Sequence, residues 1–317
     1  MVFDFLALVQ SKNRQGGSRA KRAVSAVFDA RWYTSQYPDV AEANMEPLKH
    51  YLHHGWREGR NPHLLFNTLW YLERNPDVTE AGLEPFGHFL LHGGGEARSP
   101  HPLFDTKWYM DVNQDVVKSG LNPLIYYITR ASQNDPSPHP LFDARWYLKA
   151  NQDVSRAGLK PLDHYLIAGS SEGRDPHPLF DVKYYLLMNG DISEQDQKNP
   201  LLHYLSSNPR ELRRVHPFFD SSYYFSQYPD AAQSKMLPLI HFLTCDGRDT
   251  RNPHPNFNTQ WYILCNPSVK RNKMNPLVHY ILIGARYNAS RSPSEYIACR
   301  SARSESSDTI GSLMQVQ

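Results

Sequence analysis

The sequence predicts an all-α protein, a solenoid-like tandem array of seven helical repeats of about 38 residues with no sheet. The first observation behind this prediction is a phenylalanine followed by Asp or Asn, which recurs every 38 residues with one slip of a single residue. The second is a proline at the centre of every repeat, and the third is an apolar pattern of helical spacing after it. The repeats open at Phe28, Phe66, Phe104, Phe142, Phe180, Phe219 and Phe257.

Each repeat is expected to begin with a helix of about two turns. In the first repeat, Asp29 precedes residues 30–33 and is a good N-cap, because its carboxylate accepts hydrogen bonds from the free N–H groups of the first turn. The helix should end before Pro38, since the residue that precedes a proline avoids the helical conformation. Asp39 is then expected to cap a further short turn of helix.

The second main helix is expected to begin at the central proline, whose missing N–H is no loss at the first helical position. In the first repeat Leu48, Tyr51 and Leu52 follow with the i, i+3, i+4 spacing of one buried face. A glycine then stands where a left-handed residue would end the helix, at Gly55, Gly93, Gly169 and Gly284. We therefore expect two short helices and a turn in each repeat, with no strands.

Helices of this length are not stable alone in water, so their apolar faces must be covered. We expect the opening phenylalanine, the first-helix aromatic pair and the second-helix aromatic residue to be shared between adjacent repeats. This sharing would give one continuous aromatic core along the array.

Charge and composition divide the chain into a basic N-terminal segment (1–27), the repeat array (28–294) and a disordered Ser-rich tail (295–317). The net charge is +2, and the N-terminal segment carries five basic residues against Asp4, which leaves the repeats close to neutral. A nucleic-acid partner is therefore not expected, because such a protein needs a basic stripe along its fold. We interpret the basic segment as a solvated linker, with contact to an acidic surface as the alternative.

The sequence predicts no transmembrane segment, since no stretch approaches 18 consecutive apolar residues. The basic residues follow the apolar start of the chain, which is the wrong order for a secretory signal. Cys245, Cys265 and Cys299 have no paired spacing and are interpreted as reduced thiols. The expected location is cytoplasmic, with a peripheral position at the inner membrane as a further possibility.

Two series of histidines recur and are candidate metal ligands. The first series occupies one helix position, at His50, His88, His164, His203, His241 and His279, and Tyr126 replaces it in the third repeat. The second series lies ahead of each new phenylalanine, at His63, His101, His139, His177, His216 and His254. Neither series has a Cys or carboxylate cluster at ligand spacing, so we expect structural hydrogen bonds, no metal and no cofactor.

A candidate surface for a ligand or partner consists of recurring aromatic and histidine residues. Its members are Trp32, Trp70, Trp108, Trp146 and Trp261, with His63, His101, His139 and His177. Each tryptophan precedes a tyrosine, and consecutive helical residues point about 100 degrees apart, so one member of each pair could face a sugar ring. The interpretation that we favour from sequence buries both members of each pair.

The sequence predicts no catalytic residues. Each recurring aspartate has a capping role, and no repeat contains an acid pair that the others lack. The chain also has no GxGxxG, P-loop or GxSxG motif.

The fourth repeat, FDARWYLKANQDVSRAGLKPLDHYLIAGSSEGRDPHPLFD, carries a resemblance to a known group of proteins. It resembles tandem segments of proteobacterial polysaccharide-biosynthesis proteins, often beside glycosyltransferase domains, and of some large secreted proteins with calcium-binding glycine repeats. The resemblance runs from about Phe28 to Ser294 and implies an accessory, non-catalytic module near cell-surface glycan assembly. The third repeat departs from the pattern by losing the His and the Glu-Gly-Arg loop, and the fifth has Asn208-Pro209 in place of the loop glycine.

These observations together predict a non-catalytic scaffold that binds another protein in bacterial cell-surface polysaccharide synthesis or assembly. Two alternatives remain open at this point. One is a carbohydrate-binding module that uses the tryptophans, and the other is an accessory segment or subunit of a glycosyltransferase.

Overall fold

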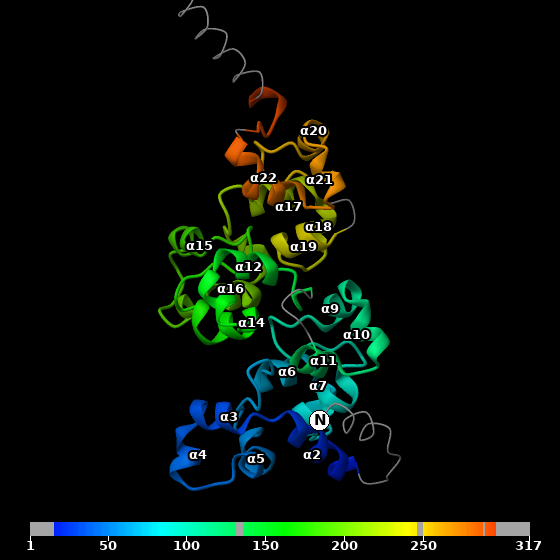
Figure 1. Ribbon diagram of the computed structural model, residues 1–317, viewed down its shortest axis with the longest axis vertical. Coiled ribbons are helices and arrows are strands. Elements are labelled where there is room, and N and C mark those ends of the chain that lie inside the picture. The colour runs from blue at the N-terminus through cyan, green and yellow to red at the C-terminus, as the bar shows by residue number, and fades with distance from the viewer. Residues whose placement is uncertain (1–15, 131–135, 246–249, 288, 296–317) are drawn as a thin grey trace, which may run out of the picture. The chain divides into compact units, whose positions relative to one another are not determined.

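The computed structural model describes residues 16–130, 136–245, 250–287 and 289–295. This part of the chain is helical, contains no sheet and has only isolated bridges such as His101 to Phe104, which confirms the predicted all-α class (Figure 1). The chain forms two compact units, Met1–Glu172 and Gly173–Gln317, and each is described by itself. The predicted basic segment and Ser-rich tail lie partly or largely outside the described residues, at 1–15 and 296–317.

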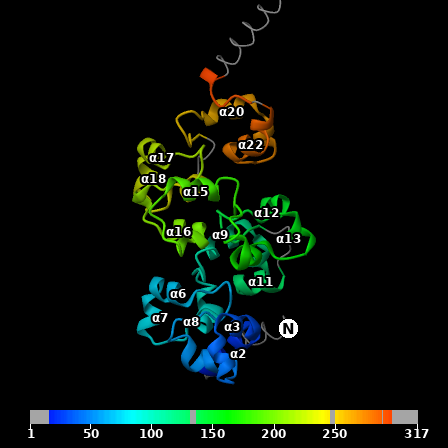
Figure 2. The ribbon, with the colours of Figure 1, turned by 90° about the vertical axis from the view of Figure 1, so that its left-hand side faces the viewer.

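The N-terminal basic segment contains a helix, α2 (Gly16–Val27). Ala23 and Val24 on this helix are completely buried. Ala20 lies so close to α8 (Pro85–His88) that a Cβ added at Gly87 would be 2.9 Å from its methyl group, and Figure 2 shows the two helices side by side. The linker interpretation is therefore wrong for residues 16–27, which belong to the first compact unit.

The first helix of every repeat has seven residues and begins where the sequence predicts. Its Asp or Asn N-cap accepts a hydrogen bond from the N–H three residues on, as from Trp146 to Asp143 Oδ1 at 3.0 Å. The helix ends before a proline in the first, second, sixth and seventh repeats, as predicted. These helices are α3 (Ala30–Gln36), α6 (Thr68–Arg74), α9 (Thr106–Val112), α12 (Ala144–Ala150), α15 (Val182–Met188), α17 (Ser221–Gln227) and α20 (Thr259–Cys265).

The further short turn of helix that the sequence predicts after the first helix is a separate α-helix in six repeats. These helices are α4 (Pro38–Glu42), α7 (Pro76–Glu80), α10 (Gln114–Ser119), α13 (Gln152–Arg156), α18 (Pro229–Gln233) and α21 (Ser268–Arg271), and the fifth repeat has the 3₁₀ turn η4 (Asp196–Lys198). Asp39 is not its N-cap, as predicted from sequence, because Tyr37 holds that position. The carboxylate of Asp39 instead receives two hydrogen bonds from Arg60, at 2.9 and 2.8 Å.

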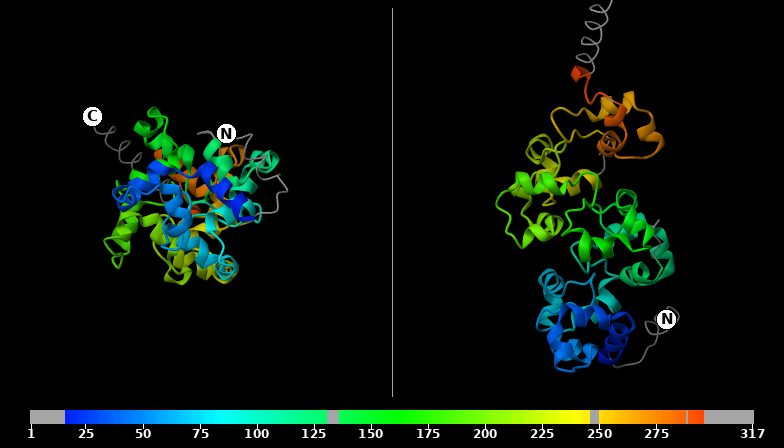
Figure 3. Two further views of the ribbon diagram at one scale, coloured as in Figure 1. Left: turned by 90° about the horizontal axis from the view of Figure 1, so that it is seen from below. Right: turned by 60° about the vertical axis from the view of Figure 1, so that its left-hand side comes forward.

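The third helix begins at the central proline in all seven repeats, as predicted. It is α5 (Pro47–His50), α8, α11 (Pro123–Thr129), α14 (Pro161–His164), α16 (Pro200–Ser206), α19 (Pro238–Thr244) and α22 (Pro276–Leu282). In three repeats it continues as a π-helical turn, η1 (Tyr51–Gly55), η2 (Phe89–Gly93) and η3 (Tyr165–Gly169). Two further 3₁₀ turns are η5 (Pro209–Glu211) and η6 (Gly284–Tyr287). Figure 3 shows the helices from two other directions.

Three aromatic rings form the core of each repeat. In the fourth repeat the ring of Phe142 lies 5.3 Å from Tyr147 and 5.5 Å from Tyr165, and the two tyrosines meet edge to face at 5.9 Å. Such edge contacts are the favoured geometry of aromatic pairs. The three rings of this cluster come from one repeat, whereas the ring of Phe218 contacts Tyr280 of a later repeat at 5.4 Å, so a core shared along the array stays a prediction.

The first-helix tyrosine is fixed at its hydroxyl by the first histidine series. Tyr147 Oη and His164 Nδ1 are joined by a hydrogen bond of 2.9 Å, and the same bond occurs in five other repeats at 2.7 to 3.0 Å. The tyrosine ring is completely buried. The bond therefore satisfies a hydroxyl that would otherwise be costly to bury.

The predicted helix-ending glycines have a different role from the one expected. Gly55, Gly93, Gly169 and Gly284 do not have a positive φ, so they are not left-handed caps. A Cβ atom at these glycines would lie 2.1 to 2.3 Å from the hydroxyl of the first-helix tyrosine in the same repeat. The glycine leaves the space that this hydroxyl occupies.

Five repeats are closed by a backbone hydrogen bond from the first-helix N-cap, at Asn67, Asp105, Asp181, Asp220 and Asn258. The N–H of Asn67 donates to the carbonyl of Pro100 at 2.9 Å, and the N–H of Asp105 donates to Pro138 at 2.8 Å. Asp181 and Asp220 repeat this bond in the second compact unit. The bond joins the start of a repeat to its terminal loop, so that three short helices form one closed unit.

Neighbouring repeats of the first compact unit are joined by the residue before the central proline. Glu84 Oε1 accepts a hydrogen bond from Tyr51 Oη at 2.7 Å, and Asn122 Nδ2 donates to the carbonyl of Phe89 at 3.0 Å. Lys160 Nζ donates to the carbonyl of Tyr127 at 2.9 Å. Three different side chains thus reach the preceding third helix from the same position.

We predict that Gly169→Ala destabilises the first compact unit by about 2 to 3 kcal/mol, because the new methyl group displaces the Tyr147 hydroxyl from its bond to His164. The free energy of unfolding, from urea denaturation, measures this loss. Gly95→Ala is the matched control, since its Cβ would meet the nearest atom at 3.4 Å, an ordinary contact.

A double mutant separates this explanation from a general effect of alanine. Tyr147→Phe removes the hydroxyl and should cost about 1 kcal/mol alone. Combined with Gly169→Ala it should cost clearly less than the sum of the two changes, because the space conflict is gone. Additive costs would contradict the steric role of this glycine.

Candidate interaction surface

The first helix of each repeat carries an aromatic residue at the edge of the core. The sequence-predicted tryptophans, Trp32, Trp70, Trp108, Trp146 and Trp261, are all half-buried, whereas the tyrosine after each of them is completely buried. Since successive helical residues point about 100 degrees apart, a tyrosine that faces the core leaves its neighbour at the margin. The interpretation that buried both members of each pair is therefore wrong.

Two members of this surface were missed in the sequence. Tyr184 on α15 and Tyr223 on α17 occupy the position of the tryptophans and are also half-buried. An aromatic residue four positions after the opening phenylalanine recurs in all seven repeats, and that spacing was the signal that could have found them. We call these seven residues the aromatic margin.

Exposed leucines extend the aromatic margin on three first helices. Leu69 adjoins Trp70 and is 65% exposed, while Leu187 and Leu264 are each 79% exposed. The last two follow Tyr184 and Trp261 by three residues, which places each pair on one face of its helix. An aromatic ring beside an exposed leucine gives a larger apolar contact area than a single exposed side chain would.

A cation lies against one ring of the aromatic margin. The guanidinium of Arg74, in the last turn of α6, is 4.7 Å from the centre of the Trp70 ring. A cation over an indole is attracted by the negative face of the ring. Helix α6 therefore presents an aromatic and a cationic group together.

The four histidines of the second series that the sequence assigns to a partner surface are turned toward the fold instead. His101, His139 and His177 are buried, and His63 is half-buried. In each of them Nδ1 accepts a hydrogen bond from the backbone N–H two residues on, as from Leu103 to His101 at 3.0 Å. An imidazole that accepts at Nδ1 and is removed from water serves as a turn-forming residue and does not present itself to a partner.

Burial also keeps these imidazoles uncharged. It lowers the pKa of His101 to about 3 and that of His216 to about 4, well below the ordinary value of 6.5. The same cause lowers the pKa of His63 to about 4, although the Asp29 carboxylate opposes it. Below pH 6.5 the unfolded chain binds protons at these imidazoles and the folded chain does not. The free energy of unfolding therefore falls as the pH drops below 6.5.

Carboxylates that recur in the repeats are held by arginines of the terminal loop. Arg60 pairs with Asp39, Arg98 with Asp77, and Arg251 with Asp230, each with two hydrogen bonds between guanidinium and carboxylate. These bonds lower the pKa of the three aspartates below its ordinary value. The acids are therefore charged and occupied, so they are poorly placed to transfer protons.

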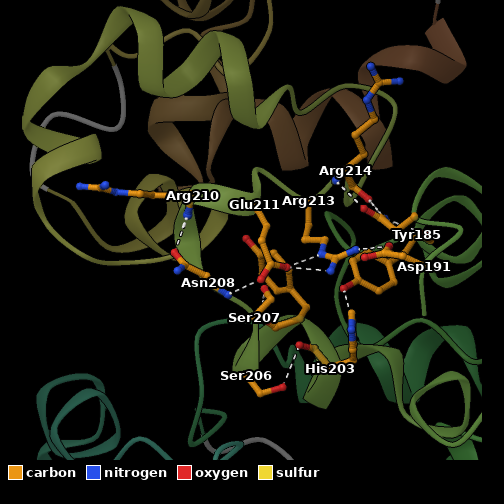
Figure 4. A network of polar contacts seen from close by, with 12 residues as sticks. Tyr185, Asp191, His203, Ser206, Ser207, Asn208, Arg210, Glu211, Arg213 and Arg214 are labelled. Carbon is orange, nitrogen blue, oxygen red and sulfur yellow. Dashed lines mark hydrogen bonds and ion pairs between the residues drawn. The ribbon is translucent and has the colours of Figure 1, made fainter. Parts of the chain in front are cut away.

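The fifth repeat keeps this pairing in spite of its altered loop (Figure 4). Arg213 pairs with Asp191 and also with Glu211, whose carboxylate lies 2.7 Å away. Asn208 caps the 3₁₀ turn η5 by accepting from the N–H of Arg210 at 3.0 Å. The departure from the repeat pattern thus builds a new turn around a retained ion pair.

Metal binding and membrane spanning have no support in the described part of the chain. Residues 16–130, 136–245, 250–287 and 289–295 contain no group of three His, Cys, Asp or Glu side chains placed to hold a metal ion. Among the same residues, no helix is both long and apolar enough to cross a bilayer.

Comparison of the chain with protein-family models, curated proteins and solved structures finds no match. A functional proposal therefore relies on the aromatic margin and on the hydrogen bonds and ion pairs of the recurring histidines and aspartates.

We predict that acidification destabilises the protein through the second histidine series. Between pH 6.5 and about 4 the unfolded chain binds protons that folded His101 and His216 do not bind, so stability should fall as the pH drops through this range. Each imidazole contributes about 1.4 kcal/mol per pH unit, and nothing above pH 6.5, where both states are neutral. Urea unfolding at pH 7.5 and pH 5.5 measures the difference.

The His101→Asn variant tests this assignment, since its Oδ1 atom can accept the Leu103 N–H as Nδ1 does but does not titrate. Its loss of stability between the two pH values should be smaller than that of the wild type by about 1.4 kcal/mol. An unchanged pH dependence in this variant would contradict the neutral, buried state of His101.

Proposed function

We propose that the protein is a non-catalytic helical-repeat scaffold that binds another protein in bacterial cell-surface polysaccharide synthesis or assembly. The observation that carries this proposal is the aromatic margin, a half-exposed aromatic side chain at one helix position in all seven repeats. Aromatic residues supply the largest share of binding energy at protein interfaces. The cellular setting comes from the sequence resemblance alone.

The polar groups of the repeats support a binding role. The first histidine series is bonded to buried tyrosines, the second to backbone N–H groups, and the recurring aspartates cap helices or pair with arginine. Each of these groups has a structural partner, whereas acid–base or nucleophilic catalysis requires groups that can reach a substrate. We propose a cytoplasmic location, with a peripheral position at the inner membrane as the alternative, on the sequence resemblance alone.

A second candidate function is carbohydrate binding, and the partial exposure of the tryptophans favours it. An indole with one open face can stack on a sugar ring, and burial of all five would have removed this candidate. Protein binding remains the leading proposal because exposed leucines adjoin the margin at three helices, and these offer little to a polar sugar.

We predict that replacing Leu69, Leu187 and Leu264 by serine weakens partner binding by at least fivefold for each leucine that is buried on binding, about 1 kcal/mol each. The full chain serves as bait in native lysate at physiological salt, and captured proteins are quantified by mass spectrometry. The triple variant should lose the partners that the wild type retains.

The matched control replaces Met45, Leu83 and Val117 by serine, because these apolar residues are also exposed but lie outside the first helices. This control should capture the same proteins as the wild type. Capture of no protein by the wild type, or equal loss in both triple variants, would count against the proposed surface.

For the carbohydrate candidate, Trp108→Ala should abolish binding on a glycan array while helix content by circular dichroism stays unchanged, since the indole is half-exposed and the fold relies on Tyr109. Val117→Ser serves as the control for an exposed apolar change in the same repeat. Absence of glycan binding by the wild type would remove this candidate and leave the protein-binding proposal untouched.

A further inference from the structure

Each first helix has a side that points away from the core. The buried tyrosine is the fourth residue of the helix, and two positions along a helix correspond to about 200 degrees of rotation. The second and the sixth residue therefore both lie nearly opposite the tyrosine, and they are neighbours at i, i+4 spacing, as Arg145 and Lys149 are in α12. In all seven repeats both of these residues are exposed. We call the second and sixth residues of the first helices the outer ridge.

The outer ridge is cationic. Its two acids are Glu73 and Asp111. Lys107 Nζ lies 2.6 Å from Asp111 Oδ2, so the charges of this pair cancel within α9. Four further cations remain against Glu73, although the seven repeats together are close to neutral. These cations are Arg31, Arg145, Lys149 and Lys183.

The acids nearest to these cations in the sequence are the N-caps, and they have backbone partners. The carboxylate of Asp143 accepts a hydrogen bond from the N–H of Trp146 at 3.0 Å, and that of Asp181 accepts from the N–H of Tyr184 at 2.8 Å. The positive end of the helix dipole also balances a carboxylate at this position. The N-caps therefore offset the charge of the outer ridge only in part.

The outer ridge also contains the exposed leucines of the first helices. Leu69 is the second residue of α6, and Leu187 and Leu264 are the sixth residues of α15 and α20. In α15 a cation and a leucine are neighbours on the ridge, since Lys183 precedes Leu187 by four positions. A partner at α15 therefore meets a positive charge and an apolar side chain beside the half-buried ring of Tyr184.

We propose that the outer ridge binds an acidic protein segment that also carries apolar side chains. The acidic side chains of the partner pair with the ridge cations, and its apolar side chains cover the leucines and the aromatic margin. This inference rests on the proposed scaffold function and names the chemistry of the partner.

An acidic polysaccharide fits the outer ridge less well than an acidic protein segment does. A chain of uronic acids carries carboxylates and hydroxyls, which pair with cations but gain nothing from covering Leu69, Leu187 or Leu264. A protein segment supplies both kinds of group. The leucines therefore decide between the two sources of negative charge.

Binding of labelled polymers to the full chain, measured by fluorescence anisotropy, tests this inference. The polymers are a glutamate–leucine copolymer, a lysine–leucine copolymer, polyglutamate and alginate, and the glutamate–leucine copolymer should bind most tightly. Replacement of Arg31, Arg145, Lys149 and Lys183 by glutamine should weaken its binding about twofold for each lost charge, or about 16-fold in all. Binding should also weaken as the salt concentration is raised from about 0.1 to about 0.5 M, because salt screens exposed charges.

The matched control replaces Lys49, Lys118, Arg156 and Lys198 by glutamine. These cations are also exposed, lie outside the first helices and are divided between the two compact units as those of the ridge variant are. Its affinity for the glutamate–leucine copolymer should equal that of the wild type. Circular dichroism and the urea midpoint should be unchanged in both variants, since all eight residues are exposed.

Several outcomes would overturn the inference. They are equal weakening by the ridge variant and the control, no measurable binding of the glutamate–leucine copolymer, and equal binding of the glutamate–leucine and lysine–leucine copolymers. Alginate binding as tight as that of the glutamate–leucine copolymer would assign the cations to an acidic polysaccharide instead.

The lysate experiment separates a failure of this inference from a failure of the scaffold proposal. Suppose that the serine variant at Leu69, Leu187 and Leu264 loses its partners while the ridge variant captures them as the wild type does. The scaffold proposal then stands and the acidic partner is wrong. Capture of no protein by the wild type counts against the scaffold proposal, whereas the polymer titration still decides the chemistry of the outer ridge.

Discussion

The hydrogen bond between a buried tyrosine and a histidine of the same repeat is the constraint on which the rest of the structure depends. In six repeats it joins the first helix to the third, across 17 residues as from Tyr147 to His164, or 18 from Tyr185 to His203. The tyrosine ring also meets the other two rings of its repeat, so one residue connects the polar and apolar parts of the core. In four repeats, glycine at the end of the third helix provides the space for this hydroxyl.

The three-ring cluster of a repeat comes from that repeat alone, whereas the side chain that joins it to the preceding repeat varies. Glu84, Asn122 and Lys160 occupy one position and differ in charge, yet each reaches the preceding third helix with a hydrogen bond. Glu84 accepts from a hydroxyl of the preceding repeat, whereas Asn122 and Lys160 donate to its backbone carbonyls. Chemical variation at the junction is therefore compatible with a constant repeat, whereas variation at the tyrosine is not.

The same constraint determines what the surface offers to other molecules. A tyrosine that is fixed in the core leaves the preceding aromatic residue at the margin, and the repetition of the unit produces seven such positions. The histidines that drew attention in the sequence are occupied within the fold, and so are the aspartates. The half-buried aromatic residues and the exposed leucines of the first helices have no such role in holding a repeat together, and the proposed function therefore relies on them.

The sequence by itself determined the helix starts, the repeat boundaries and the all-α class, because an N-cap such as Asp143 or a proline such as Pro161 acts on residues within one turn of itself. Only the tertiary structure decided that Gly169 makes room for a hydroxyl, that Asp39 pairs with Arg60, and that tryptophan and tyrosine of one pair separate into margin and core. Those outcomes depend on contacts between residues some twenty positions apart, and local spacing carries no information about which of several partners a side chain meets.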